Sequence, residues 1–254
     1  MFDRSSDLEI IGLDGIPEVR PGDDLVALIT DALERRGLLL QGGEIVVVTH
    51  KIVSKAEGRL VRLSEIEPSS FARRLADAWG RDARHIEVIL RESARIVRMD
   101  RGLIISETRH GFVCANAGVD ASNVDGQEVL CLQPLDPDAS AARIREGLRA
   151  RLGITVGVII SDSFGRAWRN GVINVAIGLA GLAPFADYRG HRDPNGYELR
   201  ASVLAVADEL AAAAELVMGK LARRPVAVIR GFQLTGTSGT ARDLVMDPMR
   251  DLFR

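Results

Sequence analysis

Two acidic segments carry the side chains best suited to chemistry in this sequence. The first contains Asp120 and Asn123 in a run of small residues, and the second is the pair Asp162 and Ser163, which follows the β-branched run 155–160. Ligands of α/β proteins commonly bind at the carboxyl ends of strands. Carboxylate, amide and hydroxyl oxygens are the donors that Mg²⁺ and Mn²⁺ prefer. The alternative interpretation is that both aspartates are ordinary turn or cap residues.

Basic side chains near these acids would complete a phosphate site. Lys51 and Lys55 follow one strand-like run, and Arg166 and Arg169 follow Asp162. Phosphoryl transfer needs mainly cations placed around a triphosphate, with the nucleophile in line. Each of these basic residues, taken alone, is also typical of a solvated surface.

Several familiar catalytic motifs are absent from the sequence. It contains no G-x-x-x-x-G-K-S/T, no G-x-G-x-x-G after a strand, no H-E-x-x-H and no G-x-S-x-G. Cys114 and Cys131 follow no metal-ligand or redox spacing, so we expect two buried thiols. P-loop, zinc-protease and serine-hydrolase chemistry are therefore disfavoured.

Composition indicates an ordinary globular protein with an aliphatic core. The chain has 254 residues, of which 46% are apolar, 27% charged and only 4% aromatic. The net charge of −2 argues against nucleic-acid binding, which needs a basic excess. No apolar run approaches the roughly 20 residues of a membrane span, and the first residues lack the layout of a secretory signal. We therefore expect a cytoplasmic protein.

Helical and strand patterns are mixed along the chain. Helices are predicted from Asp23 or Asp24 to about Gly37 and at 64–79, 82–97, 140–152 and 203–218, with a short helix near the C-terminus. Strands are predicted at 44–49, 103–106, 111–117, 155–160, 172–179 and 225–229. Because several neighbouring strands lack an intervening helix, the pattern predicts a mixed α/β (α+β) fold, with antiparallel and mixed sheets flanked by helices. We expect one domain over residues 1–254, with room for two subdomains.

Six ordered motifs resemble the coenzyme F420-0:L-glutamate ligase family. They are I-P-E-V-R-P-G-D-D at 16–24, K-I-V-S-K-A-E-G-R at 51–59, G-V-D-A-S-N-V at 118–124, L-D-P-D at 135–138, D-S-F-G-R-A-W-R at 162–169 and V-A-D-E at 206–209. The resemblance runs from about residue 7 to residue 232. It implies a homodimeric enzyme of unusual mixed α/β fold without a P-loop. Such an enzyme uses GTP with two divalent ions, Mn²⁺ or Mg²⁺, and can be stimulated by K⁺. It joins L-glutamate to coenzyme F420-0 through an acyl phosphate.

The resemblance also implies roles for individual residues. Asp120 and Asp162 correspond to ligands of the first metal, Ser163 to a position supporting the second metal, and Asn123 to a GTP contact. Lys55 would neutralise phosphate charge, which makes Asp120, Asp162 and Lys55 the candidate catalytic residues. Further nucleotide-contacting positions correspond to Ile16, Pro17, Glu18, Val19, Thr49, His50, Met218 and Gly219. His50 stands where relatives often have a small hydroxyl residue, so we expect a contact through its backbone only.

Two departures from the family pattern affect these expectations. Some archaeal relatives have a metal-binding Glu after Met-Gly, where this sequence has Lys220. A cation cannot bind a metal ion, so Lys220 is interpreted as a phosphate contact. We also expect no C-terminal nitroreductase-like domain of the kind some actinobacterial relatives carry, and hence a short glutamate tail. Two other functions remain open: a metal-dependent phosphohydrolase that uses Asp120 and Asp162, and a catalytically silent nucleotide-binding partner.

Overall fold

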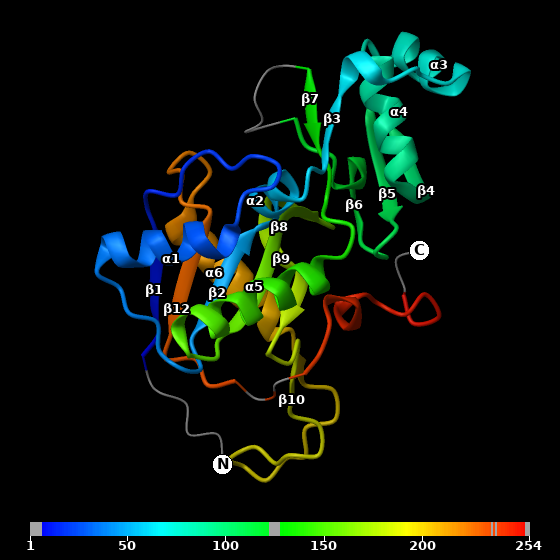
Figure 1. The fold of residues 1–254 in the computed structure, drawn as a ribbon. Helices are drawn as coiled ribbons and strands as arrows, with labels where there is room; N and C mark the ends of the chain where they lie inside the picture. The colour runs from blue at the N-terminus through cyan, green and yellow to red at the C-terminus, as the bar shows by residue number, and fades with distance from the viewer. Residues whose placement is uncertain (1–6, 122–127, 235, 237, 252–254) are drawn as a thin grey trace.

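A five-stranded mixed sheet forms the centre of the larger part of the molecule (Figure 1). The computed structural model describes residues 7–121, 128–234, 236 and 238–251. In spatial order the sheet contains β1 (Glu9–Leu13), β12 (Val226–Arg230), β2 (Ile45–Thr49), β8 (Gly157–Arg166) and β9 (Arg169–Ala180). Only the β2–β8 pair is parallel, and the other neighbours are antiparallel. The sheet interior is aliphatic: Val46, Val47, Val48, Ile159 and Ile160 are fully buried.

Helices cover both faces of this sheet. α1 (Leu25–Arg36) and α5 (Pro137–Leu152) lie in front of it in Figure 1, and α6 (Val206–Met218) lies behind it. The ends of α1 follow from its sequence. The Asp24 side chain accepts a hydrogen bond from Ala27 N at 3.0 Å, and Gly37 ends the helix with φ of 64°. The prediction of a helix between these two residues is confirmed.

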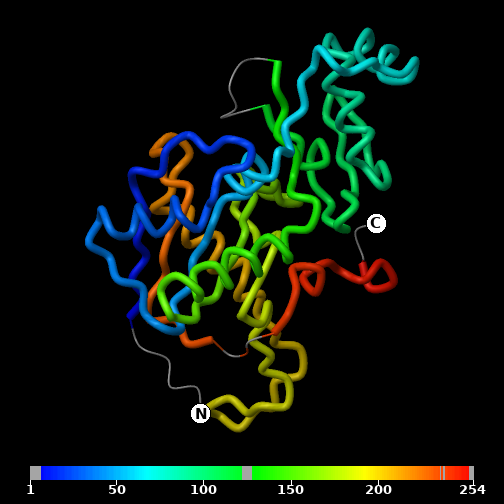
Figure 2. The backbone as a smooth tube through the Cα atoms, viewed as in Figure 1, coloured from blue at the N-terminus to red at the C-terminus, as the bar shows by residue number. Residues whose placement is uncertain are grey.

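A second hydrophobic core lies beside the main sheet, at the upper right of Figure 2. It joins α3 (Ser70–Trp79) and α4 (Ala83–Glu92) to the three-stranded sheet of β4 (Ser93–Asp100), β5 (Leu103–Thr108) and β6 (Val113–Ala115). The short pair β3 (Leu60–Arg62) and β7 (Val129–Cys131) connects this part to the rest of the chain. The turn η2 (Asn116–Gly118) leads from β6 towards Asp120.

The remaining elements are short. α2 (His50–Ala56) follows β2 without a break, η1 (Leu63–Glu65) follows β3, β10 (Ala186–Asp187) pairs with β11 (Val203–Leu204), and η3 (Ala241–Leu244) lies near the C-terminus. Helices and mixed and antiparallel sheets together confirm the predicted mixed α/β fold class. No helix in the described part of the chain is long and apolar enough to cross a bilayer.

Several predicted element boundaries are wrong. The helix predicted at 140–152 begins at Pro137, and the strand predicted at 111–117 covers only Val113–Ala115. Four further errors have an identifiable cause. The helix predicted at 64–79 begins only at Ser70, because Pro68 disfavours helix before it and Ser69 caps the helix by accepting from Ala72 N. The helix predicted at 82–97 ends at Glu92. There the Ser93 hydroxyl donates to Ile89 O at 2.7 Å, and the following residues pair with β5.

The other two boundary errors involve β8 and α6. The strand predicted at 155–160 continues to Arg166, so Asp162 and Ser163 lie within β8 rather than beyond its end. Their main chains pair with β9 at Val175 and Asn174 after a register shift. The helix predicted at 203–218 begins at Val206, because the two residues of β11 pair with β10.

Close packing of β9 on the start of α5 generates a stability prediction. A Cβ at Gly178 would lie 2.4 Å from Pro137 O, whereas a Cβ at Gly165 would meet nothing within 4 Å. Overpacking of this kind typically costs about 1–3 kcal/mol. We expect Gly178→Ala to lower the free energy of unfolding by about that amount in urea titrations, and Gly165→Ala to leave it nearly unchanged. Equal stabilities for the two variants would contradict this packing.

The two cysteines generate a reactivity prediction. Both are buried free thiols. Burial, reinforced by the charge of Asp162, raises the pKa of Cys114 to about 12, and burial raises the pKa of Cys131 to about 11. Because the thiolate is the reactive form, we expect no alkylation of the native protein by iodoacetamide at pH 8, and full alkylation in urea. Mass spectrometry of the intact protein measures both, and rapid modification of the native protein would contradict their burial.

Candidate active site

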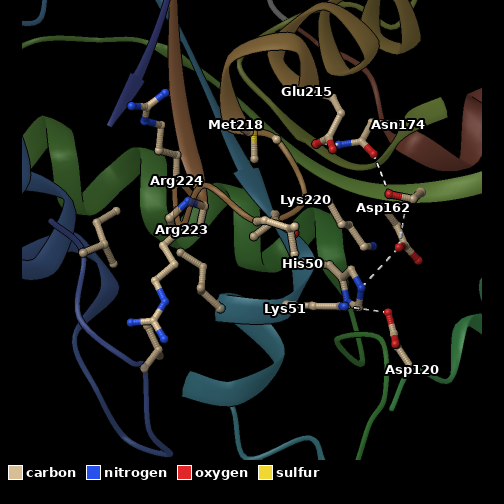
Figure 3. A pocket seen from close by; sticks show the side chains of 18 of the residues that line it. His50, Lys51, Asp120, Asp162, Asn174, Glu215, Met218, Lys220, Arg223 and Arg224 are labelled. Carbon is tan, nitrogen blue, oxygen red and sulfur yellow. Dashed lines mark hydrogen bonds and ion pairs between the residues drawn. The ribbon is translucent and has the colours of Figure 1, made fainter. Parts of the chain in front are cut away.

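A cavity of about 720 Å³ lies beside the junction of β2 and α2 (Figure 3). Its walls come from six parts of the chain: the segment 16–19, the β2–α2 junction with α2, Asp120, the middle of β8, the facing part of β9, and the end of α6 with the residues that follow it. Cavities of this size are typical of small-molecule and cofactor sites.

Most of the site residues predicted from the sequence that the structure describes line this one cavity, whereas Arg166 and Arg169 do not. Those that line it include Ile16, Pro17, Glu18, Val19, Thr49, His50, Lys55, Asp120, Asp162, Ser163, Met218, Gly219 and Lys220. Asn123 lies outside the described residues. The sequence motifs therefore meet in space, although their roles as ligands remain predictions.

Two neighbouring residues of α2 contact the two candidate metal-binding aspartates. His50 Nε2 lies 3.2 Å from Asp162 Oδ1, and Lys51 Nζ lies 2.6 Å from Asp120 Oδ2. Both contacts are visible in Figure 3. His50 is only 1% exposed, and its Nδ1 lies 3.3 Å from the Ser54 hydroxyl. The expectation of a nucleotide contact through the His50 backbone stays a prediction, and the structure adds a contact of the His50 side chain with Asp162.

Asp162 is a carboxylate held on both oxygens. Oδ1 accepts from Ser163 N at 2.7 Å, and Oδ2 accepts from Gln133 Nε2 at 2.9 Å. Burial alone would raise the pKa of Asp162, but the charge and hydrogen bond of His50, together with the Gln133 and Ser163 hydrogen bonds, keep this pKa below its usual value. Asp162 is therefore maintained as an anion, the form that a cation requires.

Asp120 is fixed through its main chain. Its N–H donates to Cys131 O at 3.0 Å, and Cys131 N donates back to Asp120 O at 2.8 Å. The preceding turn has left-handed backbone at Asn116, Ala117 and Gly118, with φ of 53°, 53° and 67°. This conformation is unfavourable for residues other than glycine and typically persists at functional sites. The Asp120 side chain remains 31% exposed and points into the cavity.

Two consecutive hydrogen bonds connect Ser163 to α6. The Ser163 hydroxyl donates to Asn174 Oδ1 at 2.7 Å, and Asn174 Nδ2 donates to Glu215 Oε2 at 3.0 Å. Asn174 is buried in β9, and Glu215 lines the cavity from the last turns of α6. These contacts place a hydroxyl, an amide and a carboxylate next to Asp162.

Cationic side chains line the rest of the cavity. The buried Lys55 forms an ion pair with Glu18. Lys220, Arg223 and Arg224 follow α6, and Arg224 Nε is 2.5 Å from Asp14 Oδ1. Cations and carboxylates that line the same cavity suit a ligand that carries phosphates and a bound cation.

The oxygen donors fit a hard divalent ion whose remaining ligands come from a substrate. No group of three or more His, Cys, Asp or Glu side chains suited to a metal occurs among the described residues. Mg²⁺ in phosphoryl-transfer sites is commonly held by only one or two carboxylates together with phosphate oxygens and water. Asp120, Asp162 and Ser163 provide that kind of incomplete oxygen set.

Several residues of the site were not identified from the sequence, among them the cations Arg223 and Arg224. Asn174 has a recognisable signal, since it is a polar residue inside an apolar strand run. Glu215 was hidden, because a glutamate on an alanine-rich helix is typically solvated. Gln133 precedes Pro134 in a turn-like segment and has no distinguishing feature in the sequence.

Comparison with known proteins matches nearly the whole chain to the family that its motifs resemble. The family model for F420-0:Gamma-glutamyl ligase matches residues 15–231. A coenzyme F420:L-glutamate ligase of Methanopyrus kandleri is 48% identical over 242 residues, which are 93% of this chain and 94% of that protein. The enzyme of the same name from Methanothermobacter thermautotrophicus is 46% identical over 97% of this chain and 99% of its own length.

A third relative is similar to this chain over the full length of both proteins. The coenzyme F420:L-glutamate ligase of Methanocaldococcus jannaschii is 39% identical over 100% of each chain. The matched region contains the whole cavity, from the segment 16–19 to the residues after α6. The chain therefore belongs to the F420-0:gamma-glutamyl ligase family.

Proposed function

We propose that this protein is a GTP-dependent ligase that adds L-glutamate to coenzyme F420-0 in coenzyme F420 biosynthesis. The observation that carries the proposal is the meeting of Asp120 and Asp162 beside Lys55 in one cavity of about 720 Å³. Family membership and the names of the relatives, coenzyme F420:L-glutamate ligase, support the choice of substrates.

The proposed reaction proceeds in two balanced steps. A carboxylate oxygen of F420-0 attacks the γ-phosphorus of GTP, which forms an acyl phosphate and releases GDP. The amine of glutamate then attacks the acyl carbon, loses a proton and expels inorganic phosphate, which leaves an amide. Activation is needed because a free carboxylate has no adequate leaving group.

The side chains of the cavity have distinct tasks in this scheme. Asp120 and Asp162 would hold the first divalent ion, Mn²⁺ or Mg²⁺, and Ser163 with Glu215 nearby would support the second. These ions would neutralise phosphate charge and orient the transferred group. Lys55 and Lys51 lie on α2 beside the carboxylates and are placed to neutralise phosphate oxygens, and Lys220 is a further phosphate contact.

The proposal is tested directly by product formation. We expect the purified protein with F420-0, GTP, L-glutamate and Mn²⁺ to release GDP and phosphate and to form a product heavier by one glutamyl residue, measured by mass spectrometry. Asp162→Asn keeps the size and the hydrogen-bonding oxygen but removes the charge, so we expect at least about 100-fold lower kcat. Asp31→Asn, at an exposed position of α1, is the matched control and should retain full activity.

The same assay separates the two other functions. A metal-dependent phosphohydrolase should release phosphate from GTP at full rate without F420-0 or glutamate. A catalytically silent nucleotide-binding partner should bind GTP but form no product, and Asp162→Asn should leave its role intact. Phosphate release that depends on both acceptors excludes both alternatives.

Lys55 generates a second prediction for the reaction. Removing a buried charge that pairs with phosphate costs about 1.5–3 kcal/mol, or roughly 10- to 100-fold in affinity. We expect Lys55→Met to raise KM for GTP by that factor, with unchanged thermal unfolding, because its partner Glu18 is exposed and stays solvated. Arg62→Met changes an exposed cation of β3 that does not line the cavity, and it should leave KM for GTP unchanged. Equal values of KM for wild type and Lys55→Met would contradict the role of Lys55.

A further inference from the structure

Gln133 is a buried polar residue between the two aspartate segments. It lies two residues after the end of β7 and is only 3% exposed. Its main chain is anchored on the opposite side, where Arg59 Nε donates to Gln133 O at 3.0 Å and Leu132 N donates to Arg59 O at 3.0 Å. The described part of the cavity wall does not include Gln133, so any effect on a ligand must act through its neighbours.

The side-chain amide of Gln133 fixes the orientation of Asp162. Gln133 Nε2 donates to Asp162 Oδ2 at 2.9 Å, while Ser163 N and His50 Nε2 approach Oδ1. A carboxylate with donors on both oxygens cannot rotate about its terminal bond without losing one of them. Gln133 therefore determines which lone pairs of Asp162 face the cavity.

The same amide also packs on the segment that carries Asp120. A Cβ at Gly118 would lie 2.5 Å from Gln133 Nε2 and 2.7 Å from its Cδ, so the amide rests directly on the Gly118 backbone. Asp120 in turn pairs through its main chain with Cys131, just before Gln133. The segment 131–133 thus contacts Asp120 through its backbone and Asp162 through one side chain.

An unsatisfied atom argues against a purely structural role for this residue. Gln133 Oε1 is buried and has no hydrogen-bond partner among the described residues. A buried carbonyl oxygen without a partner is destabilising, and an apolar side chain of the same length would avoid that cost. Gln133 is therefore poorly explained by packing alone, whereas its hydrogen bond to Asp162 serves a carboxylate of the site.

We propose that Gln133 is a positioning residue that sets the geometry of Asp120 and Asp162 and thereby the affinity of the site for a divalent cation. The inference rests on the proposed use of metal ions by these two aspartates. Residues that orient metal-binding carboxylates through hydrogen bonds typically contribute 10- to 100-fold to metal affinity. Gln133 acts on the cation through Asp162 and through the segment 118–120, and it needs no contact with any substrate.

The test measures Mn²⁺ binding by electron paramagnetic resonance of the free ion, in the presence of saturating GDP. We expect Gln133→Met, which keeps length and removes the donor, to raise the Kd for Mn²⁺ about 10- to 100-fold. The matched control is Gln41→Met at an exposed position, for which Kd should equal that of wild type. Gln133→Asn keeps an amide in a smaller volume that cannot reach Asp162. Gln133→Asn should therefore raise the Kd for Mn²⁺ by the same factor. This variant provides the test if Gln133→Met does not fold.

Steady-state kinetics separate positioning from a general loss of structure. A positioning role raises the Mn²⁺ concentration needed for half-maximal activity, while kcat largely recovers at saturating Mn²⁺. Lower kcat at all Mn²⁺ concentrations with an unchanged Kd for Mn²⁺ would overturn the inference.

Wild type and Asp162→Asn are measured in the same titration. If wild type binds no Mn²⁺, or if Asp162→Asn binds it equally well, the proposed metal site itself fails. If Asp162→Asn abolishes binding and Gln133→Met does not change it, only the role of Gln133 fails.

Discussion

The candidate site depends on the first turn of α2, where two adjacent residues contact two carboxylates that are distant in the sequence. His50 approaches Asp162 and Lys51 pairs with Asp120. The position of this turn is fixed because β2 is buried between β12 and β8, and the chain enters α2 directly after Thr49. A shift of this junction would separate both contacts at once, so the precision of the site depends on the central sheet.

Holding carboxylates in a partly buried cavity requires compensation for lost hydration. Asp162 receives donors from the main chain of Ser163 and from the side chain of Gln133, besides its contact with His50. The Asp120 side chain loses less hydration, because it remains partly exposed. Its position is fixed by main-chain hydrogen bonds with Cys131. A divalent ion would reinforce both arrangements by supplying positive charge.

The two hydrophobic cores meet at this site. Asp162 belongs to the main sheet, whereas Asp120 follows a turn that packs on the second core through Ala117 and Val119. The left-handed turn at residues 116–118 brings the Asp120 segment from one core to the edge of the other. The geometry of the site therefore depends on how the two cores pack, which explains why a buried amide between them can affect both carboxylates.

The local sequence by itself determined several helix ends, the candidate site residues and the fold class. Asp24 and Gly37 specify the ends of α1 because caps involve only neighbouring residues. The residues of each motif are contiguous in the sequence, so Asp120, Asp162, Ser163 and Lys55 could be predicted as site residues from the order of residues, and the structure places all four in one cavity. The mixed α/β class also followed from the order of local patterns.

Tertiary structure decided the features that depend on contacts between segments distant in the sequence. Residues 93–97 carry a helix-compatible pattern, yet they form a strand because β5 supplies their hydrogen bonds. The contact of the His50 side chain with Asp162 was not anticipated from the sequence, and it exists because β2 and β8 are neighbours. The hydrogen bonds of Gln133, Asn174 and Glu215 in the site are also long-range contacts. Each depends on the relative positions of distant segments, which no single stretch of sequence specifies.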